Sequence, residues 1–566
     1  MKILIPFSRA IYLAAIVLAT ACTPDFQVEE TTITEIHAAM ETGRLSAEQL
    51  VQMYLDRIEA YDKQGASINS LITINQEALS RARELDIAFA VTGFVGPLHG
   101  IPVIVKDNYD TADLPTTNGV LALKGAIPPD DAFQVARLRE AGAIILAKAN
   151  LAEFATSGAH TVSSVLPGYT RNPYDTRRVT AGSSGGTAAA VAANFGTVGL
   201  GTDTGSSIRG PSSHQALVGF RTTQGLSSRD GIAPLNSARD VGGPIARTVT
   251  DAVKVLEVIV GYDPADPVTE TSEGQIPENY TQFLDSTGLV GVRIGVLREF
   301  FELVDAEQDG PQPSLVQDDD ATAGDEAQNE GEGQDQDEQH DEDEDEQQEE
   351  ERVPRKIHPE VLALLEQALV DMATAGAVIV DSVEIPHLDS LRSEFPSIQR
   401  WRYDFDAYLA TRPEVPRATM EEILESGDFS PRLRASLQRA VEVEGAPEDH
   451  EDWPKYQEAT EALGAAVTAA MDEANVDVLV YPTYNYPPRL IGDESTTYGA
   501  NSGTLSPPTG FPAFNLPMGY SFDELPSGLQ LLGRAFSEPT MIRISYMYEQ
   551  ITQHRRPPTS TPPIAN

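Results

Sequence analysis

"GLGTDTGSSIRGP", residues 199–211, gathers glycines, small hydroxyl side chains, one aspartate and one arginine, with almost no apolar surface to bury. Such a stretch can be a linker, a turn, an anion-binding loop or the position of an attacking serine. Successive backbone N–H groups around Gly205 can form a nest that stabilises an oxyanion beside a serine. A serine hydroxyl attacks poorly unless a base removes its proton, so the remaining sequence has to supply that base.

A second segment places a lysine after a strand pattern. In "HGIPVIVKDN" (99–108), Lys106 directly follows a short apolar run. A lysine at a strand end usually reaches solvent, whereas burial would lower its pKa and allow it to act as a neutral base. Both interpretations stay open from this segment alone.

A third segment, "VTAGSSGGTAAA" (179–190), matches G-x-S-x-G with Ser184 in the central position. A nucleophile elbow requires an apolar strand before it, but the polar "YDTRRVT" precedes it here. No G-K-[ST] follows, which excludes a Walker phosphate loop, and a simple Gly/Ser turn before a helix also fits. The three segments contain no histidine except His99, which precedes the strand, so serines activated by a lysine are the favoured chemistry.

Helix and strand patterns alternate along the body of the chain. Ser46 and Gln49 form a capping box before an amphipathic helix. Short apolar runs such as 143–147 are typical of strands buried on both faces. We predict an α/β fold with helices on both faces of one large sheet. The other predicted elements are strands in 101–105, 292–297, 377–383 and 478–482, a helix in 187–196, and a helix through Leu362 and Met372 that ends at Gly376.

Residues 1–21 have the pattern of a secretory signal peptide, with two basic residues before a short apolar stretch that ends in small residues. Cys22, the only cysteine, completes a lipobox-like "LATAC", while the same residues offer an A-x-A cleavage site. We therefore expect an exported chain with a linker at 22–30, and favour a lipid on Cys22 over a freely soluble form. Membrane contact is expected only through that lipid.

About half of the net charge of −46 falls in one segment. Between residues 305 and 351 there are 22 Asp or Glu residues and no Lys or Arg, so residues 304–352 are predicted to be a disordered acidic insertion. The remainder is also acidic, which argues against nucleic acid as a partner. No metal site emerges, because the nine histidines are scattered and the acidic run lacks the turn residues of a calcium loop.

The rest of the chain is expected to form a single domain from residues 31–303 and 353–554. Residues 555–566 are rich in proline and are expected to form a loose tail.

Taken together, the three segments resemble the amidase signature family. A lysine after an apolar strand, a Gly/Ser loop and G-T-D-x-G-x-S-I-R occur in the family's order, and Ser207 lies 24 positions after Ser183. Downstream, "GFPAFNLPMG" and "PSGLQLLGRAFSE" are similar to the family's C-terminal signature. The resemblance covers nearly the whole mature chain, and the acidic insertion has no counterpart in it.

The resemblance implies a single large α/β/α sandwich with a mostly buried mixed sheet. It also implies a hydrolase of linear amide bonds that takes a small-molecule amide and uses no cofactor. Ser207 would be the nucleophile that forms an acyl-enzyme. Ser183, after a cis peptide bond, would be the proton relay, and Lys106 would be the base.

The same resemblance assigns the loop around the nucleophile. Backbone N–H groups of Thr204, Gly205 and Ser206 would form the oxyanion hole. Asp203 and Arg209 would brace this loop by pairing, which is a structural role.

Ser206 departs from the family, which most often has glycine there, and its Cβ enters a loop whose residues can require unusual dihedrals. A catalytically silent ligand-binding lipoprotein of the same fold is therefore an alternative. A hydrolase that uses Ser184 with a distant histidine is less favoured. The glutaminase-type subunit of an amidotransferase is also less favoured, because its cytoplasmic partners do not fit an exported chain. "ANLAEFATSG" (149–158) is expected to line the acyl pocket, but it does not identify the substrate.

Overall fold

The computed structural model describes residues 26–303, 356–493, 495–496 and 499–564. The predicted signal peptide, Cys22 and the acidic insertion lie outside the described residues. Within the described ranges, no helix is both long and apolar enough to cross a membrane. Nor do three or more His, Cys, Asp or Glu side chains gather there in a way that could hold a metal ion.

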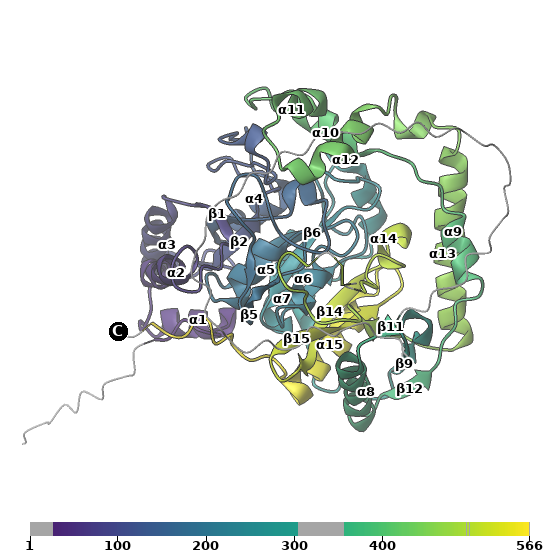
Figure 1. Cartoon of the computed structure of the whole chain (residues 1–566). Coiled ribbons are helices and arrows are strands. Elements are labelled where there is room, and N and C mark those ends of the chain that lie inside the picture. The colour runs from purple at the N-terminus through teal and green to yellow at the C-terminus, as the bar shows by residue number, and fades with distance from the viewer. Residues whose placement is uncertain (1–25, 304–355, 494, 497–498, 565–566) are drawn as a thin grey trace, which may run out of the picture.

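A mixed sheet of eleven strands forms the centre of the molecule (Figure 1). Its order is β1-β3-β2-β6-β8-β7-β14-β15-β13-β9-β12. Neighbouring strands are parallel within β3-β2-β6 and within β13-β9-β12, and antiparallel elsewhere in the sheet. The strands are β1 (Leu71–Ile74), β2 (Pro102–Lys106), β3 (Ile144–Ala149), β6 (Val198–Asp203), β7 (Val218–Arg221), β8 (Val241–Ala246), β9 (Arg293–Val296), β12 (Val378–Asp381), β13 (Val478–Pro482), β14 (Ala513–Ser521) and β15 (Leu525–Leu532).

In the part of the chain that the structure describes, two short strand pairs lie outside the sheet. β4 (Arg171–Asn172) pairs with β5 (Asp175–Val179), and β10 (Glu302–Leu303) pairs in parallel with β11 (Lys356–Ile357). The second pair joins the two ends of the chain that flank residues 304–355. The predicted acidic insertion therefore begins and ends between neighbouring strands, where an insertion is tolerated.

The helices confirm the predicted α/β class with helices on both faces. Ile245 of β8 packs in a cluster with α5 and with Ile208, which directly precedes α6, whereas its neighbour Ala246 packs in the main core with α7. Successive strand residues point to opposite faces, so these helices cover opposite sides of the sheet. The helices are α1 (Ile33–Glu41), α2 (Ala47–Tyr61), α3 (Ala78–Thr92), α4 (Phe133–Glu140), α5 (Gly185–Ala192), α6 (Arg209–Ser213), α7 (Val249–Ile259), α8 (Pro359–Thr374), α9 (Leu388–Ser393), α10 (Trp401–Ala410), α11 (Met420–Ser426), α12 (Arg434–Val441), α13 (Trp453–Glu473), α14 (Ser506–Thr509) and α15 (Glu538–Thr552).

The glycines of the quoted stretch have a packing reason. A Cβ on Gly199 would lie 2.5 Å from Cγ2 of Thr187 in α5, and a Cβ on Gly201 would lie 2.9 Å from Oγ of Ser184. Strand β6 can therefore touch α5 only because these positions lack side chains. This close approach brings the Gly/Ser loop and the loop after β6 to the same edge of the sheet.

Most predicted elements are confirmed. The capping box of Ser46 and Gln49 begins α2, and the predicted strands correspond to β2, β3, β9, β12 and β13. The sequence analysis made no prediction for α10, α11 and α12, which lie together at one end of the molecule (Figure 1). They pack with Phe154 in a second apolar cluster, apart from the main core.

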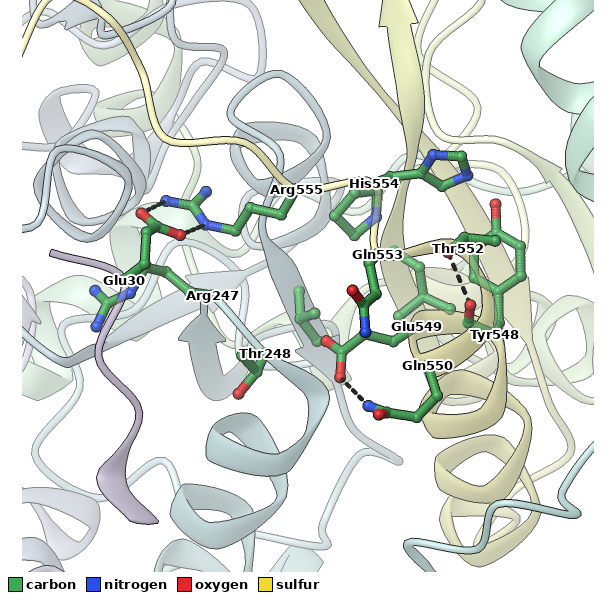
Figure 2. Close-up of a pocket in the computed structure, with 13 residues that line it drawn as sticks. Glu30, Arg247, Thr248, Tyr548, Glu549, Gln550, Thr552, Gln553, His554 and Arg555 are labelled. Atoms are coloured by element: carbon green, nitrogen blue, oxygen red, sulfur yellow. Dashed lines mark hydrogen bonds and ion pairs between the residues drawn. The ribbon is translucent and has the colours of Figure 1, made fainter. Parts of the chain in front are cut away.

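The expected loose tail is wrong for residues 555–561. Arg555 is paired with Glu30 through two contacts of 2.7 and 2.8 Å, at one wall of a cavity of about 230 Å³ (Figure 2). The buried guanidinium of Arg57 donates to the carbonyls of Thr561 at 2.8 Å and Pro562 at 3.1 Å. Two arginines thus hold the tail against the N-terminal part of the domain, and proline content alone did not indicate this.

Candidate active site

Lys106 ends β2, and its side chain is fully buried. Its Nζ lies 2.8 Å from Oγ of Ser183 and 2.7 Å from Oγ1 of Thr202. Burial lowers the pKa of Lys106 from 10.5 to about 7, although the carboxylates of Asp203 and Asp240 favour its charged form. The interpretation as a solvent-reaching lysine is therefore wrong. With a pKa of about 7, a substantial fraction of the molecules carry Lys106 as a neutral amine at neutral pH.

Ser183 is held against Lys106 by its own loop. The peptide bond between Gly182 and Ser183 is cis, as the resemblance implies. Gly182 has no room for a side chain, because a Cβ there would lie 2.5 Å from O of Ser157 and 2.6 Å from O of His160. The carbonyl of Ser183 accepts a hydrogen bond of 3.0 Å from the N–H of Ala152.

Ser184 has a different environment from Ser183. Its hydroxyl donates to the carbonyl of Thr202 at 3.1 Å and accepts from the N–H of Thr202 at 3.3 Å. Within the described part of the chain, no histidine hydrogen-bonds to it. Ser184 therefore links α5 to β6, and a nucleophile elbow at this position lacks its base.

Residues 204–207 form a loop between β6 and α6, and Ser207 ends it. Within the described part of the chain, the backbone N–H groups of Thr204, Gly205 and Ser206 donate to no acceptor. Thr204 and Gly205 are half-buried, and a Cβ on Gly205 would meet nothing within 4 Å. The N–H of Ser184 donates to the carbonyl of Ser207 at 3.2 Å, so this loop adjoins the Ser183 loop. Three unused amide donors on one loop suit a carbonyl oxygen that gains negative charge.

Ser206 fits this loop without backbone strain. Its φ lies outside the left-handed region that favours glycine. The space for its side chain is provided by Gly158, because a Cβ on Gly158 would lie 2.9 Å from Oγ of Ser206. The departure from glycine therefore gives no structural reason for a catalytically silent protein.

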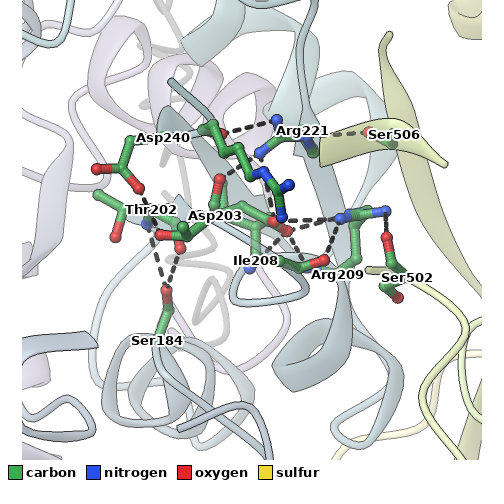
Figure 3. A network of polar contacts seen from close by, with 12 residues as sticks. Ser184, Thr202, Asp203, Ile208, Arg209, Arg221, Asp240, Ser502 and Ser506 are labelled. Carbon is green, nitrogen blue, oxygen red and sulfur yellow. Dashed lines mark hydrogen bonds and ion pairs between the residues drawn. The ribbon is translucent and has the colours of Figure 1, made fainter. Parts of the chain in front are cut away.

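Asp203 and Arg209 form the predicted brace, and Arg221 joins it (Figure 3). Nε of Arg209 lies 3.0 Å from Oδ2 of Asp203, and its Nη2 donates to the carbonyl of Gly205 at 2.8 Å. Oδ2 of Asp203 also accepts the N–H of Ile208 at 3.1 Å. Burial opposes ionisation, but the two arginines lower the pKa of Asp203 to about 2. The brace thus stays charged at neutral pH and fixes both ends of the loop.

Three further residues of this site had no role in the sequence analysis. Thr202, which contacts Lys106, is a hydroxyl inside the quoted stretch and could have been found there. Arg221 donates to the carbonyl of Asp203 and, at 3.0 Å, to Oγ of Ser506. Asp240 accepts a hydrogen bond from Oγ1 of Thr204. The contacts of Arg221 and Asp240 depend on strand pairing, so no local pattern indicates them.

Comparisons with known proteins agree with this geometry. A family model described as Amidase matches residues 49–311 and 349–542. A probable amidase of Arabidopsis thaliana is 30% identical over 556 residues, which cover 94% of this chain and 92% of that protein. A glutamyl-tRNA(Gln) amidotransferase subunit of Moorella thermoacetica is 31% identical over 537 residues, covering 93% and 97%.

Solved structures give the same result. The native peptide amidase of Stenotrophomonas maltophilia aligns with a TM-score of 0.76 at 32% identity, over 94% of this chain and 98% of that one. The peptide amidase in complex with the competitive inhibitor chymostatin aligns with a TM-score of 0.74 at 33% identity, over 94% and 99%. The chain therefore belongs to the amidase signature family, whose members hydrolyse amide bonds through a Ser-Ser-Lys triad.

Proposed function

We propose that this protein is an exported serine amidohydrolase that cleaves a carboxamide C–N bond through an acyl-enzyme on Ser207. The observation that carries the proposal is the 2.8 Å contact between the buried amine of Lys106 and Oγ of Ser183. A buried lysine with a pKa near 7 is a base at neutral pH. Its partner is a serine hydroxyl, through which a proton can pass.

Acylation would proceed by a proton relay. Ser207 gives its proton to Ser183 as Ser183 gives its own to neutral Lys106, and Oγ of Ser207 bonds to the amide carbon. The carbonyl oxygen becomes an oxyanion, which the N–H groups of Thr204, Gly205 and Ser206 stabilise. The C–N bond then breaks as the proton returns from Lys106 through Ser183 to the leaving nitrogen.

Deacylation would use the same groups in reverse. Water gives a proton through Ser183 to Lys106 and attacks the ester carbon of acylated Ser207. The C–O bond to Ser207 breaks, the serine recovers its proton, and a carboxylic acid leaves. The scheme draws on no cofactor.

The substrate class we propose is a small amide. The peptide amidases named above support an amide at the end of a short peptide as the first compound to try. The amidotransferase relatives point to a glutaminase-type activity as a second candidate. It is less favoured than the peptide-amide substrate, because the acidic charge of the chain and the signal-like residues 1–21 argue against a role with tRNA in the cytoplasm.

Substitution of the nucleophile tests the proposal. In Ser207→Ala, amide turnover should fall by at least about 10⁴-fold, because no acyl-enzyme can form. The matched control is Ser227→Ala, which removes another buried serine whose hydroxyl donates to the carbonyl of Ile259. The control should keep turnover, and both variants should unfold at nearly the wild-type temperature. Retained turnover in folded Ser207→Ala would overturn the assignment.

Export and lipid anchoring are a separate part of the proposal. The support is Cys22, placed directly after a signal-like segment. Metabolic labelling with a fatty-acid analogue should tag the wild type and not Cys22→Ala. An unlabelled wild type found outside the cytoplasm would leave only the freely soluble exported form.

A further inference from the structure

Asp240 lies beside the loop that carries the nucleophile. It directly precedes β8, which pairs antiparallel with β6 in a register that places Val241 opposite Asp203. One step further along this ladder, Asp240 is opposite Thr204. The hydroxyl of Thr204 donates to Oδ1 of Asp240, whose side chain is buried.

The carboxylate of Asp240 is a fixed acceptor. Its Oδ2 accepts the N–H groups of Leu235 at 3.0 Å and Asn236 at 2.9 Å. Its own N–H donates to the carbonyl of Asn236 at 2.8 Å. The loop 235–240 is therefore held to the side chain of Asp240 through Oδ2. Oδ1 remains available to accept the hydrogen bond from Thr204.

Arg221 connects the same two loops a second time. Its Nη2 donates to the carbonyl of Arg239 at 2.8 Å, and its Nη1 donates to the carbonyl of Asp203. Arg221 thus holds Arg239 and Asp203 together. The hydrogen bond between Thr204 and Asp240 joins the next residue of each loop.

Thr204 carries two groups with different tasks. Its hydroxyl is bound to Asp240, whereas its backbone N–H has no acceptor within the described residues. A bound side chain restricts χ1 and the backbone dihedrals of its own residue. Oxyanion donors stabilise a transition state only when they are already aimed at the place where charge develops.

We propose that Asp240 is a positioning residue for catalysis, which holds Thr204 through its hydroxyl so that the N–H of Thr204 stays aimed at the substrate oxygen. Asp240 touches neither the substrate nor the reacting atoms in this account. The inference rests on the proposed function, because it presupposes an oxyanion formed at Ser207.

Four variants test this role, with kcat and KM measured separately on an amide that the wild type turns over. Thr204→Val removes the hydroxyl and keeps the shape of the side chain, and Asp240→Asn removes the charge. Each should lower kcat by about 10- to 100-fold and change KM by less than about 3-fold, because substrate binding does not use the oxyanion contact. Thr204→Ser should stay within about 3-fold of the wild-type kcat, because it keeps the donor. The double variant should be no worse than the less active single variant, because Thr204→Val already removes the hydrogen bond through which Asp240 acts on the loop.

Asp62→Asn is the matched control. Asp62 is a buried carboxylate that accepts the hydroxyl of Ser70 at 2.6 Å and its N–H at 2.7 Å, next to the end of α2. It should cost stability in the same way as Asp240→Asn and leave kcat unchanged. If Asp240→Asn does not fold, the two Thr204 variants still decide the matter.

The results separate this inference from the proposed function. Thr204→Val with more than half of the wild-type kcat, losses confined to KM, or losses that multiply in the double variant would each overturn the inference. In those cases the proposed function stands if Ser207→Ala is inactive. Turnover in folded Ser207→Ala would instead remove the proposed function, and the inference with it.

Discussion

Two fully buried lysines on neighbouring strands have different partners. Lys106 ends β2, and Lys148 lies in β3 opposite Val105, so the two side chains project from opposite faces of the sheet. Nζ of Lys148 lies 3.1 Å from Oδ1 of Asp107 and within hydrogen-bond distance of four further oxygen atoms of residues 109–116. Lys106 contacts the hydroxyls of Ser183 and Thr202, and within the described chain no carboxylate lies at ion-pair distance from it.

Both lysines are fully buried, so the difference between them lies in their partners. Burial disfavours the charged form of any lysine. Lys148 forms an ion pair with the carboxylate of Asp107. Within the described residues, the hydrogen-bond partners of Lys106 are hydroxyl and carbonyl oxygens, and burial lowers its pKa to about 7. The substitutions below, from the largest expected effect to the smallest, test this contrast.

Lys106→Met should have the largest effect, and it should act on catalysis. We expect kcat/KM to fall by at least about 10⁴-fold, because Ser207 loses its base. The free energy of unfolding at pH 7 should not fall, because a poorly paired buried amine is replaced by an apolar side chain. Steady-state kinetics and urea unfolding measure the two effects, and a loss of activity below about 100-fold would contradict the assignment of the base.

Lys148→Met should act mainly on stability, whereas Lys106→Met acts on catalysis. The free energy of unfolding should fall by about 3–5 kcal/mol in urea, because Asp107 is left as a buried carboxylate without its cation. Adding Asp107→Asn should recover at least half of this loss. The folded fraction should keep far more activity than Lys106→Met. Equal losses of activity in Lys106→Met and Lys148→Met would contradict the assignment of Lys106 as the base and Lys148 as a structural residue.

The pH dependence of kcat/KM should reflect the protonation of Lys106. Below about pH 7, kcat/KM should fall about tenfold per pH unit as the amine becomes protonated, and above it the rate should level off. The folded pKa lies below the unfolded value, so between about pH 7 and 10.5 the unfolded chain binds more protons, and this contribution to stability rises with pH.

The comparison of the wild type with Lys106→Met isolates this contribution. Any stability advantage of the variant at pH 7 should be smaller at about pH 9.5, because in this range the unfolded wild type holds a proton that the folded protein lacks, and the free energy gained by that protonation falls as the pH rises. If the difference in the free energy of unfolding between the wild type and Lys106→Met does not change with pH, folding does not shift the pKa of Lys106.

Ser206→Gly should have the smallest effect. The φ of Ser206 already lies outside the left-handed region, and its hydroxyl lies in space left by Gly158. We expect kcat to stay within about 3-fold of the wild type. A rise above tenfold on any amide would show that the serine obstructs the oxyanion loop.

The sequence predicted the central sheet well because its strands carry their own signals. Apolar runs such as 101–105 need no partner to be recognised, and the resemblance carried by "GLGTDTGSSIRGP" predicted the pairing of Asp203 with Arg209. The structure brings Lys106 to Ser183, two residues 77 positions apart that only the resemblance had connected.

The remaining features depend on contacts that no local pattern carries. Whether Lys106 is buried is decided by the packing above β2, and the same sequence fits a solvent-reaching lysine. The position of Asp240 beside Thr204 follows from the register of β6 and β8. Arg221 reaches Ser506 across 285 positions of sequence. The tail from Arg555 is ordered by Glu30 and Arg57, which lie more than 500 positions earlier.

The most direct test of the account is peptide mapping of a fluorophosphonate adduct in the wild type, Lys106→Met and Lys148→Met. The reagent bonds to an activated serine oxygen with loss of fluoride, so it reports the nucleophile without knowledge of the substrate. The account predicts rapid labelling of Ser207 in the wild type and in folded Lys148→Met, and almost none in Lys106→Met. Labelling of Ser184, or of Ser207 at the wild-type rate in Lys106→Met, would contradict it.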